Sequence, residues 1–101
     1  SAHGSHAEGQ GTTASGLGSH AEGVSAEATA QGAHAEGIQT KAQGLASHTE
    51  GLSCQALKDY SHAEGWGTIA ASNNQHVEGK YNVEDAEGKY VHIVGNGTQD
   101  N

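Results

Sequence analysis

Polar and small residues alternate along this chain in a pattern that returns every 14 residues. The constant part is the phrase histidine–x–glutamate–glycine, present in six copies without an insertion. Such a period predicts a solenoid, in which each repeat forms one coil that packs against its neighbours. The constant histidines are His6, His20, His34, His48, His62 and His76; the glutamates are Glu8, Glu22, Glu36, Glu50, Glu64 and Glu78; the glycines are Gly9, Gly23, Gly37, Gly51, Gly65 and Gly79.

Within each repeat, constant positions lie two residues apart and variable ones lie between them, which is the periodicity of a β-strand. A second constant position, occupied by Ala14, Ala28, Ala42, Ala56 and Ala70, indicates a second strand. We therefore expect two short strands per coil, with one turn at Gly9 and its equivalents and another near Gly16, Gly32 and Gly44. The predicted fold class is an all-β parallel β-roll or β-helix, about 29 Å long for six coils.

One apolar column runs through the repeats in exact 14-residue register. It consists of Val24, Ile38, Leu52 and Trp66, each directly after the glycine of its phrase. Two interpretations remain open at this point. The column is either a seam between subunits or an edge of the core within one chain.

The composition offers little for a conventional core. The chain has 101 residues with no Phe, no Met, one Trp and three Tyr, and its mean hydropathy is −0.67. About half of its hydrophobic residues are alanine. Small chains bury a modest share of their surface, so we expect self-association to supply the missing burial. The pattern is already under way at Ser1, which favours a segment of a longer protein.

Charge and the remaining residues exclude several function classes. The formal net charge of −8 argues against nucleic-acid binding, because no basic patch is present to neutralise phosphates. No apolar run is long enough to predict insertion into a membrane. Cys54 is the single cysteine and occupies a slot filled by Thr or Ala in other repeats, so we interpret it as a small packed residue.

The period fails after Gly79, so we divide the chain into a repeat array at 1–79 and a C-terminal capping or transition segment at 80–101. A terminal unit that departs from the repeat is expected at the end of a solenoid. The β-branched run at 91–94 predicts one further strand. The residues Gly95-Asn96-Gly97 predict a turn after it.

The histidines and glutamates share one face of their strand and should form two ladders along the rod. The interpretation we favour is structural, with imidazole–carboxylate bonds in a polar core or subunit interface. A second interpretation is a transition-metal site at one or two layers of a threefold axis, with these histidines and glutamates as ligands for Zn, Ni or Fe. A third, a solvent-facing surface for a host ligand, conflicts with the constancy of these positions. Histidine–x–glutamate alone is too small a fragment to indicate an enzyme.

The tandem phrases resemble the head repeats of trimeric autotransporter adhesins. Residues 5–79 match the frame and the small positions of those repeats, but His and Glu stand where Val-like and Ile-like residues are usual. The resemblance implies a left-handed parallel β-roll and a homotrimer. It also implies a bacterial cell-surface location and binding to host surfaces.

The ending, from Gln75-His76-Val77-Glu78-Gly79 to Gly88-Lys89-Tyr90-Val91-His92-Ile93-Val94-Gly95-Asn96-Gly97, is similar to tail-fibre and tail-spike proteins of phages and prophages. In those proteins such arrays precede a self-cleaving intramolecular chaperone domain. This second resemblance implies a virion protein, with other tail proteins and a host cell-surface polysaccharide or protein as partners. Asn101 fits a self-cleavage end and an arbitrary boundary equally well.

Overall fold

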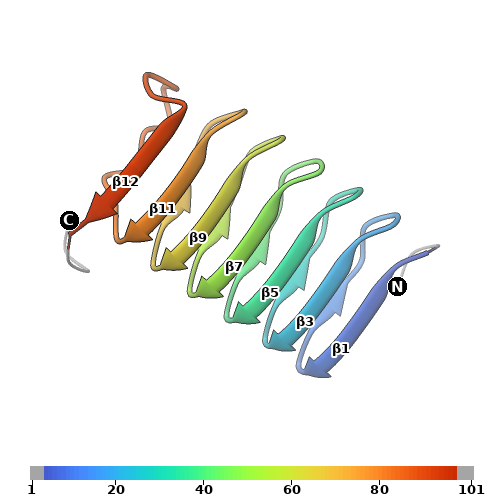
Figure 1. The fold of residues 1–101 in the computed structure, drawn as a ribbon. Coiled ribbons are helices and arrows are strands. Elements are labelled where there is room, and N and C mark those ends of the chain that lie inside the picture. Colours follow the sequence, from blue (N-terminus) through green and yellow to red (C-terminus); the bar gives the residue numbers. More distant parts are fainter. Residues whose placement is uncertain (1–3, 98–101) are drawn as a thin grey trace.

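The computed structural model describes residues 4–97, which form twelve β-strands and no helix (Figure 1). Each of the first five coils contributes a five-residue strand and then a two-residue strand, and β11 and β12 follow without short strands. The long strands are β1 (His6–Gln10), β3 (His20–Val24), β5 (His34–Ile38), β7 (His48–Leu52), β9 (His62–Trp66), β11 (His76–Lys80) and β12 (His92–Asn96). The short strands are β2 (Thr13–Ala14), β4 (Glu27–Ala28), β6 (Lys41–Ala42), β8 (Gln55–Ala56) and β10 (Ile69–Ala70). The predicted all-β solenoid with two strands per coil is confirmed.

Every strand pairs in parallel with its equivalent in the next coil. The long strands form one seven-stranded sheet in the order β1-β3-β5-β7-β9-β11-β12, and the short strands form a five-stranded sheet. The register places each residue beside the same position of the repeat, as in His6↔His20 and Ala7↔Ala21. Identical side chains therefore stack in columns along the whole array.

The two sheets enclose a core made of small side chains. From the long strands, Ala21, Ala35, Thr49, Ala63 and Val77 point inward and are 0% exposed. From the short strands, Ala28, Ala42, Ala56 and Ala70 meet them and are also 0% exposed. Such small side chains let the sheets approach closely, and the molecule measures 35 × 23 × 14 Å. The result is a thin slab whose interior excludes large residues.

The phrase glycine lies inside the strand, so the prediction of a turn at Gly9 and its equivalents is wrong. Gly37, for example, has φ +108, and a Cβ there would meet the carbonyl oxygen of Gly51 at 2.1 Å. Close backbone approach between coils therefore requires glycine here. The turn follows two residues later, at left-handed positions such as Gln39 with φ 58. The other predicted turn, near Gly16, Gly32 and Gly44, is confirmed.

The C-terminal segment rejoins the same sheet instead of forming a separate unit. Strand β12 pairs in parallel with β11, with His76 opposite His92, so this step is 16 residues long instead of 14. The strand predicted at 91–94 is present, but the predicted turn is wrong because Gly95 and Asn96 belong to β12. The Asn101 end lies outside the described residues.

Polar side chains close the last coil where a short strand would follow. The Asn82 amide copies a strand backbone: the Ile69 N–H donates to its Oδ1 at 2.8 Å, and its Nδ2 donates to the Ile69 carbonyl at 3.1 Å. The Asp85 carboxylate accepts from the Tyr90 N–H at 2.8 Å, and this bond is the main cause that lowers the pKa of Asp85. The open edge of the five-stranded sheet is thereby satisfied.

Candidate functional site

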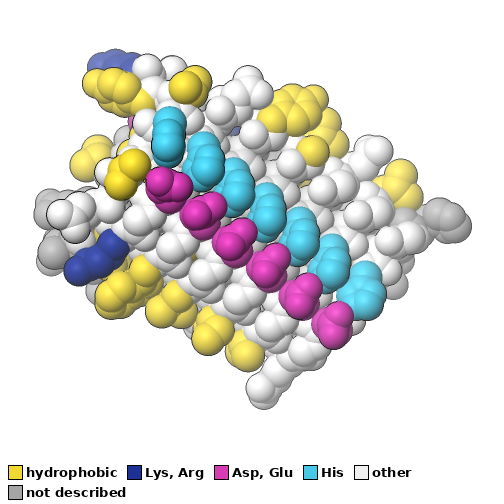
Figure 2. Space-filling model, viewed as in Figure 1, with side chains coloured by type: hydrophobic (Ala, Val, Ile, Leu, Met, Phe, Trp, Pro, Cys, Tyr) yellow, Lys and Arg dark blue, Asp and Glu magenta, His cyan; other side chains and the backbone are white. Residues whose placement is uncertain are grey.

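The histidine and glutamate columns lie on the outer face of the seven-stranded sheet (Figure 2). They alternate with the inward alanines along each strand, so the pleat turns them away from the core. Their side chains are half-exposed; those of His34 and Glu36 are 35% and 41% exposed. The interpretation of the ladder as a polar core within one chain is therefore wrong. A place in a subunit interface stays a prediction.

The imidazole rings stack on one another along the whole array. Neighbouring rings from His20 to His76 have centroids 4.6 Å apart and are nearly parallel, as for His62 and His76 at 1°. The stack loosens at its two ends, where His6 and His92 are tilted by 34° against their neighbours. This spacing follows from the strand separation of a parallel sheet in register.

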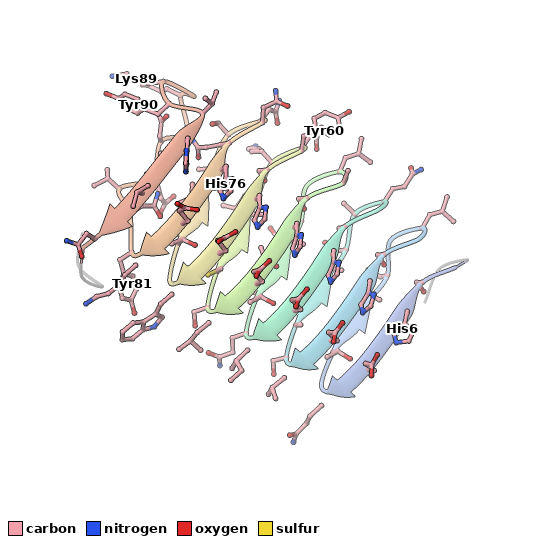
Figure 3. All side chains as sticks on the ribbon, in the orientation of Figure 1. His6, Tyr60, His76, Tyr81, Lys89 and Tyr90 are labelled. Carbon is pink, nitrogen blue, oxygen red and sulfur yellow. The ribbon has the colours of Figure 1, made fainter. Side chains whose placement is uncertain are left out.

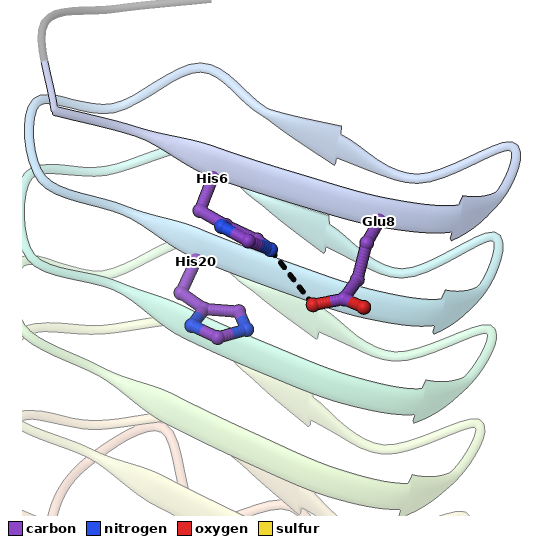
Figure 4. Close-up of side chains that lie close together, drawn as sticks. All are labelled: His6, Glu8 and His20. Carbon is purple, nitrogen blue, oxygen red and sulfur yellow. Dashed lines mark hydrogen bonds and ion pairs between the residues drawn. The ribbon is translucent and has the colours of Figure 1, made fainter.

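Each glutamate approaches the histidine of its own coil, and several also approach the next. The Oε1 of Glu36 lies 2.9 Å from Nε2 of His34 and 3.7 Å from Nε2 of His48. The Oε1 of Glu64 lies 2.9 Å and 3.6 Å from the corresponding atoms of His62 and His76. One carboxylate oxygen thus serves two imidazoles. In the first coil Glu8 pairs with His6 alone, and Figure 4 shows this pair beside His20.

Most of these close contacts lack hydrogen-bond geometry. The first pair, His6 and Glu8, is hydrogen-bonded at 2.7 Å. The Nε2 atoms of His20, His34, His48, His62 and His76 are shielded from solvent and make no hydrogen bond. Their ion-pair distances to carboxylate oxygens run from 2.7 to 3.5 Å within a coil, so the mismatch is one of direction. These imidazole nitrogens retain unused bonding capacity.

The electrostatics of the stack favour neutral imidazole in its centre. Burial lowers the pKa of His48, and the neighbouring His62 and His34 act in the same direction. The Glu50 and Glu36 carboxylates raise the pKa of His48, but by less than burial and the two neighbouring rings lower it. An imidazolium ring stacked between two others would meet like charge on both sides. The stack therefore favours the neutral ring at His48.

Apolar side chains border the same face. The column Val24, Ile38, Leu52 and Trp66 follows the glutamates along one edge and is 41%, 48%, 38% and 45% exposed (Figure 2). It lies outside the core, so the interpretation as a core edge within one chain is wrong. The opposite turns expose Leu17 and Tyr60, and Figure 3 shows Tyr60 at that edge, away from Tyr81.

Sequence reasoning missed one member of the ladder. His92 stacks over His76 with ring centroids 5.0 Å apart, and its Nε2 lies 3.6 Å from Oε2 of Glu78. The two-residue lengthening of the last coil conceals this equivalence. The spacing of His92 and Gly95, which equals that of His76 and Gly79, was the signal that could have revealed it. Val94 replaces the glutamate in this coil and ends the acidic column.

Cys54 is 0% exposed and accepts a hydrogen bond from the Thr68 hydroxyl at 3.2 Å, as expected of a packed residue. Residues 4–97 include no helix that could span a bilayer. Comparison with protein-family models, curated proteins and solved structures finds no match to this chain.

Proposed function

We propose that this chain is a structural segment of a homotrimeric fibre, of the kind that forms phage tail fibres and tail spikes. The observation that carries the proposal is an inverted distribution of side chains. The buried side chains are mainly alanine, serine and threonine, with Cys54, Val77 and Gln75, whereas the large apolar residues Ile38, Leu52 and Trp66 are exposed. Exposed apolar columns of this kind are typical of association surfaces.

Stacked coils supply the mechanical part of this role. Backbone hydrogen bonds between parallel strands run along the long axis of the slab, so force along the fibre loads every coil in series. In a trimer, the outer face of each chain would pack toward its neighbours, and its apolar edge would be covered. Residues that vary between coils, such as Lys41 and Gln55 on the short strands, would remain outside for contact with host surfaces.

The deciding measurement is the native mass by sedimentation equilibrium at several concentrations. We expect three times the chain mass of 10.2 kDa. A matched pair of variants locates the contact surface. Leu52→Asp should dissociate the trimer, whereas Thr29→Asp, at an exposed position after the short strand β4, should leave it intact. A folded monomer across the concentration range would overturn the proposal.

A further inference from the structure

We propose that the outer ladder binds divalent transition-metal ions, each held by two stacked histidines and the glutamate between them. The three disjoint groups are His6–Glu8–His20, His34–Glu36–His48 and His62–Glu64–His76. Every donor atom within a group lies within 4.8 Å of the others. All three donors come from one chain, so the proposal does not depend on assembly.

The donor chemistry selects the class of ion. Imidazole nitrogen with carboxylate oxygen suits Zn²⁺, Ni²⁺ and Co²⁺, whereas Mg²⁺ and Ca²⁺ prefer oxygen alone. A neutral imidazole binds a metal through the Nε2 lone pair when its proton is on Nδ1. Where Nε2 carries the proton, as in the His6–Glu8 hydrogen bond, that proton must move to Nδ1 or to solvent before the metal binds. The glutamate contributes the negative charge that offsets part of the ionic charge.

The distances need little adjustment for coordination. Adjacent ligand atoms around a first-row ion lie about 3–3.5 Å apart. In the middle group, Nε2 of His34 and Oε1 of Glu36 are already 2.9 Å apart, and Nε2 of His48 is 3.7 Å from the same oxygen. Placing all three donors on one ion shortens the longer distance by less than about 1 Å. It also requires the stacked His34 and His48 rings, whose centroids are 4.6 Å apart, to tilt until both Nε2 lone pairs point at the ion. In Figure 4 both imidazole rings of the first group lie on the same side of Glu8.

Most of the histidine Nε2 atoms also have no hydrogen-bond partner that a metal ion would have to displace. The shielded Nε2 atoms of His20, His34, His48, His62 and His76 make no hydrogen bond, although buried polar atoms are usually paired. Lysine does not compete for the carboxylates in the described part of the chain: Lys89 pairs with Glu87, and Lys80 lies over the Trp66 ring. A metal ion would satisfy both columns at once.

Repulsion between ions limits the number that can bind. Dications in adjacent gaps would be about 4.8 Å apart, whereas ions in every second gap are about 9.6 Å apart. At two histidines per ion, the seven histidines of the ladder also allow three ions and leave one histidine over. The inference therefore specifies a stoichiometry of three ions per chain.

The test is calorimetric titration of ZnCl₂ into the intact chain, purified without a metal-affinity column and stripped with EDTA. We expect saturation at three Zn²⁺ per chain and a melting temperature that rises with Zn²⁺ and returns on adding EDTA. A rise reports binding to the folded state, because binding to histidines of the unfolded chain would lower the melting temperature. Absence of heat at micromolar Zn²⁺, or a lowered melting temperature, would overturn the proposal.

Variants separate the proposed groups from adventitious binding. The double variant Glu36→Gln/His48→Ala should bind two ions instead of three. Glu36→Gln alone preserves shape and should weaken one site about tenfold if the double variant fails to fold. The control Glu27→Gln, on the short strand β4, should still bind three. If all variants bound the same number of Zn²⁺ ions per chain, the binding would be adventitious and the proposal would be wrong.

Sedimentation of the same samples keeps this inference distinct from the fibre proposal. An assembled chain that takes up no Zn²⁺ contradicts the metal sites and leaves the fibre intact. A monomer that takes up three Zn²⁺ contradicts the fibre and leaves the metal sites intact.

Discussion

The inner and outer faces of the seven-stranded sheet are built by alternate residues of the same strands, yet they follow opposite rules. The inner face of strand β5 presents Ala35, which is 0% exposed. The outer face presents His34, Glu36 and Ile38, and Ile38 remains 48% exposed. An ordinary domain buries its large apolar residues and leaves small or polar ones outside.

In a globular protein the large apolar residues form the core, whereas here small residues form the core and the large apolar residues lie on the outer face. The inner face permits close approach of two sheets, so its energetic contribution comes from tight packing of small groups and from the backbone ladder. The outer face holds the histidines, the glutamates and the large apolar side chains, which are half-exposed and should contribute less to folding of the single chain. Substitutions on the two faces should therefore have different consequences, and the size of that difference is measurable.

The largest loss of stability is expected at the constant glycine, where the backbone of the next coil leaves no room for a side chain. In Gly51→Ala the new Cβ would lie 2.1 Å from the Gly65 carbonyl oxygen, at a φ of +110. Backbone cannot yield as a side chain can, so we expect a loss of roughly 3 kcal/mol in the free energy of unfolding. The measurement is urea denaturation followed by circular dichroism.

The matched control for this glycine is Gly18→Ala. Gly18 also has a positive φ, +68, but a Cβ there meets nothing within 4 Å. Gly18→Ala should therefore lower the free energy of unfolding by about 1 kcal/mol, from backbone strain alone. If the two variants were equally stable, close approach between coils would not explain the constant glycine.

A second substitution tests how tightly the inner face is packed. Ala35→Leu inserts three carbon atoms between two sheets of alanine and should cost about 2–3 kcal/mol through overpacking. Ala7→Leu makes the same change at the same repeat position, but Ala7 lies in the first coil and is exposed. Denaturation midpoints should fall for the inner variant and change little for the terminal one. Comparable losses would show that position in the coil, not burial, controls the effect.

The end of the inner face should show a smaller effect. Asn82→Ala removes the amide that pairs with both backbone groups of Ile69, leaving a part-buried N–H and carbonyl unsatisfied. We expect a loss of about 1–2 kcal/mol. Hydrogen exchange should locate it in the last coils, because solenoid repeats couple to their nearest neighbours. The exposed Asn96→Ala serves as the control, and protection lost evenly along the array would contradict a local cap.

Much of this architecture could be predicted because the 14-residue period imposes one register on every coil. Period-two alternation correctly placed His34 and Glu36 together on one side of the strand. It could not decide which side was the interior, because that depends on the sheet separation, and Ala35 sets that separation. The expectation that constant residues are buried was therefore wrong for the ladder of a single chain.

Two local features escaped the pattern for a different reason. Glycine usually indicates a turn, but Gly37 is constant because the next coil approaches its Cα, a contact 14 residues away in sequence. The seventh histidine, His92, was hidden by a two-residue lengthening that shifts the period while keeping the strand pairing. Both errors arise where tertiary packing overrides a local rule.

The smallest loss of stability is expected for Val→Thr on the outer face. This substitution gives the sharpest comparison, because the same chemical change can be made on each face. Val77 points inward and is 0% exposed, whereas Val24 points outward and is 41% exposed. Val→Thr keeps the shape and replaces a methyl group by a hydroxyl. At Val77 the hydroxyl is buried, and we expect a loss of about 1–2 kcal/mol. At Val24 it reaches solvent, and the loss should stay below about 0.5 kcal/mol.

A natural threonine bears on this last prediction. Thr49 occupies the same inward position two coils earlier and is also 0% exposed, with its hydroxyl unbonded. The slab therefore tolerates one such hydroxyl already, and the reverse change Thr49→Val should stabilise the chain by a similar amount. Unfolding measured on dissociated protein isolates the fold from assembly. Stabilisation by Thr49→Val, together with neutrality at Val24, would establish that folding depends on the inner face; a loss at Val24 matching that at Val77 would instead make the outer column part of the core.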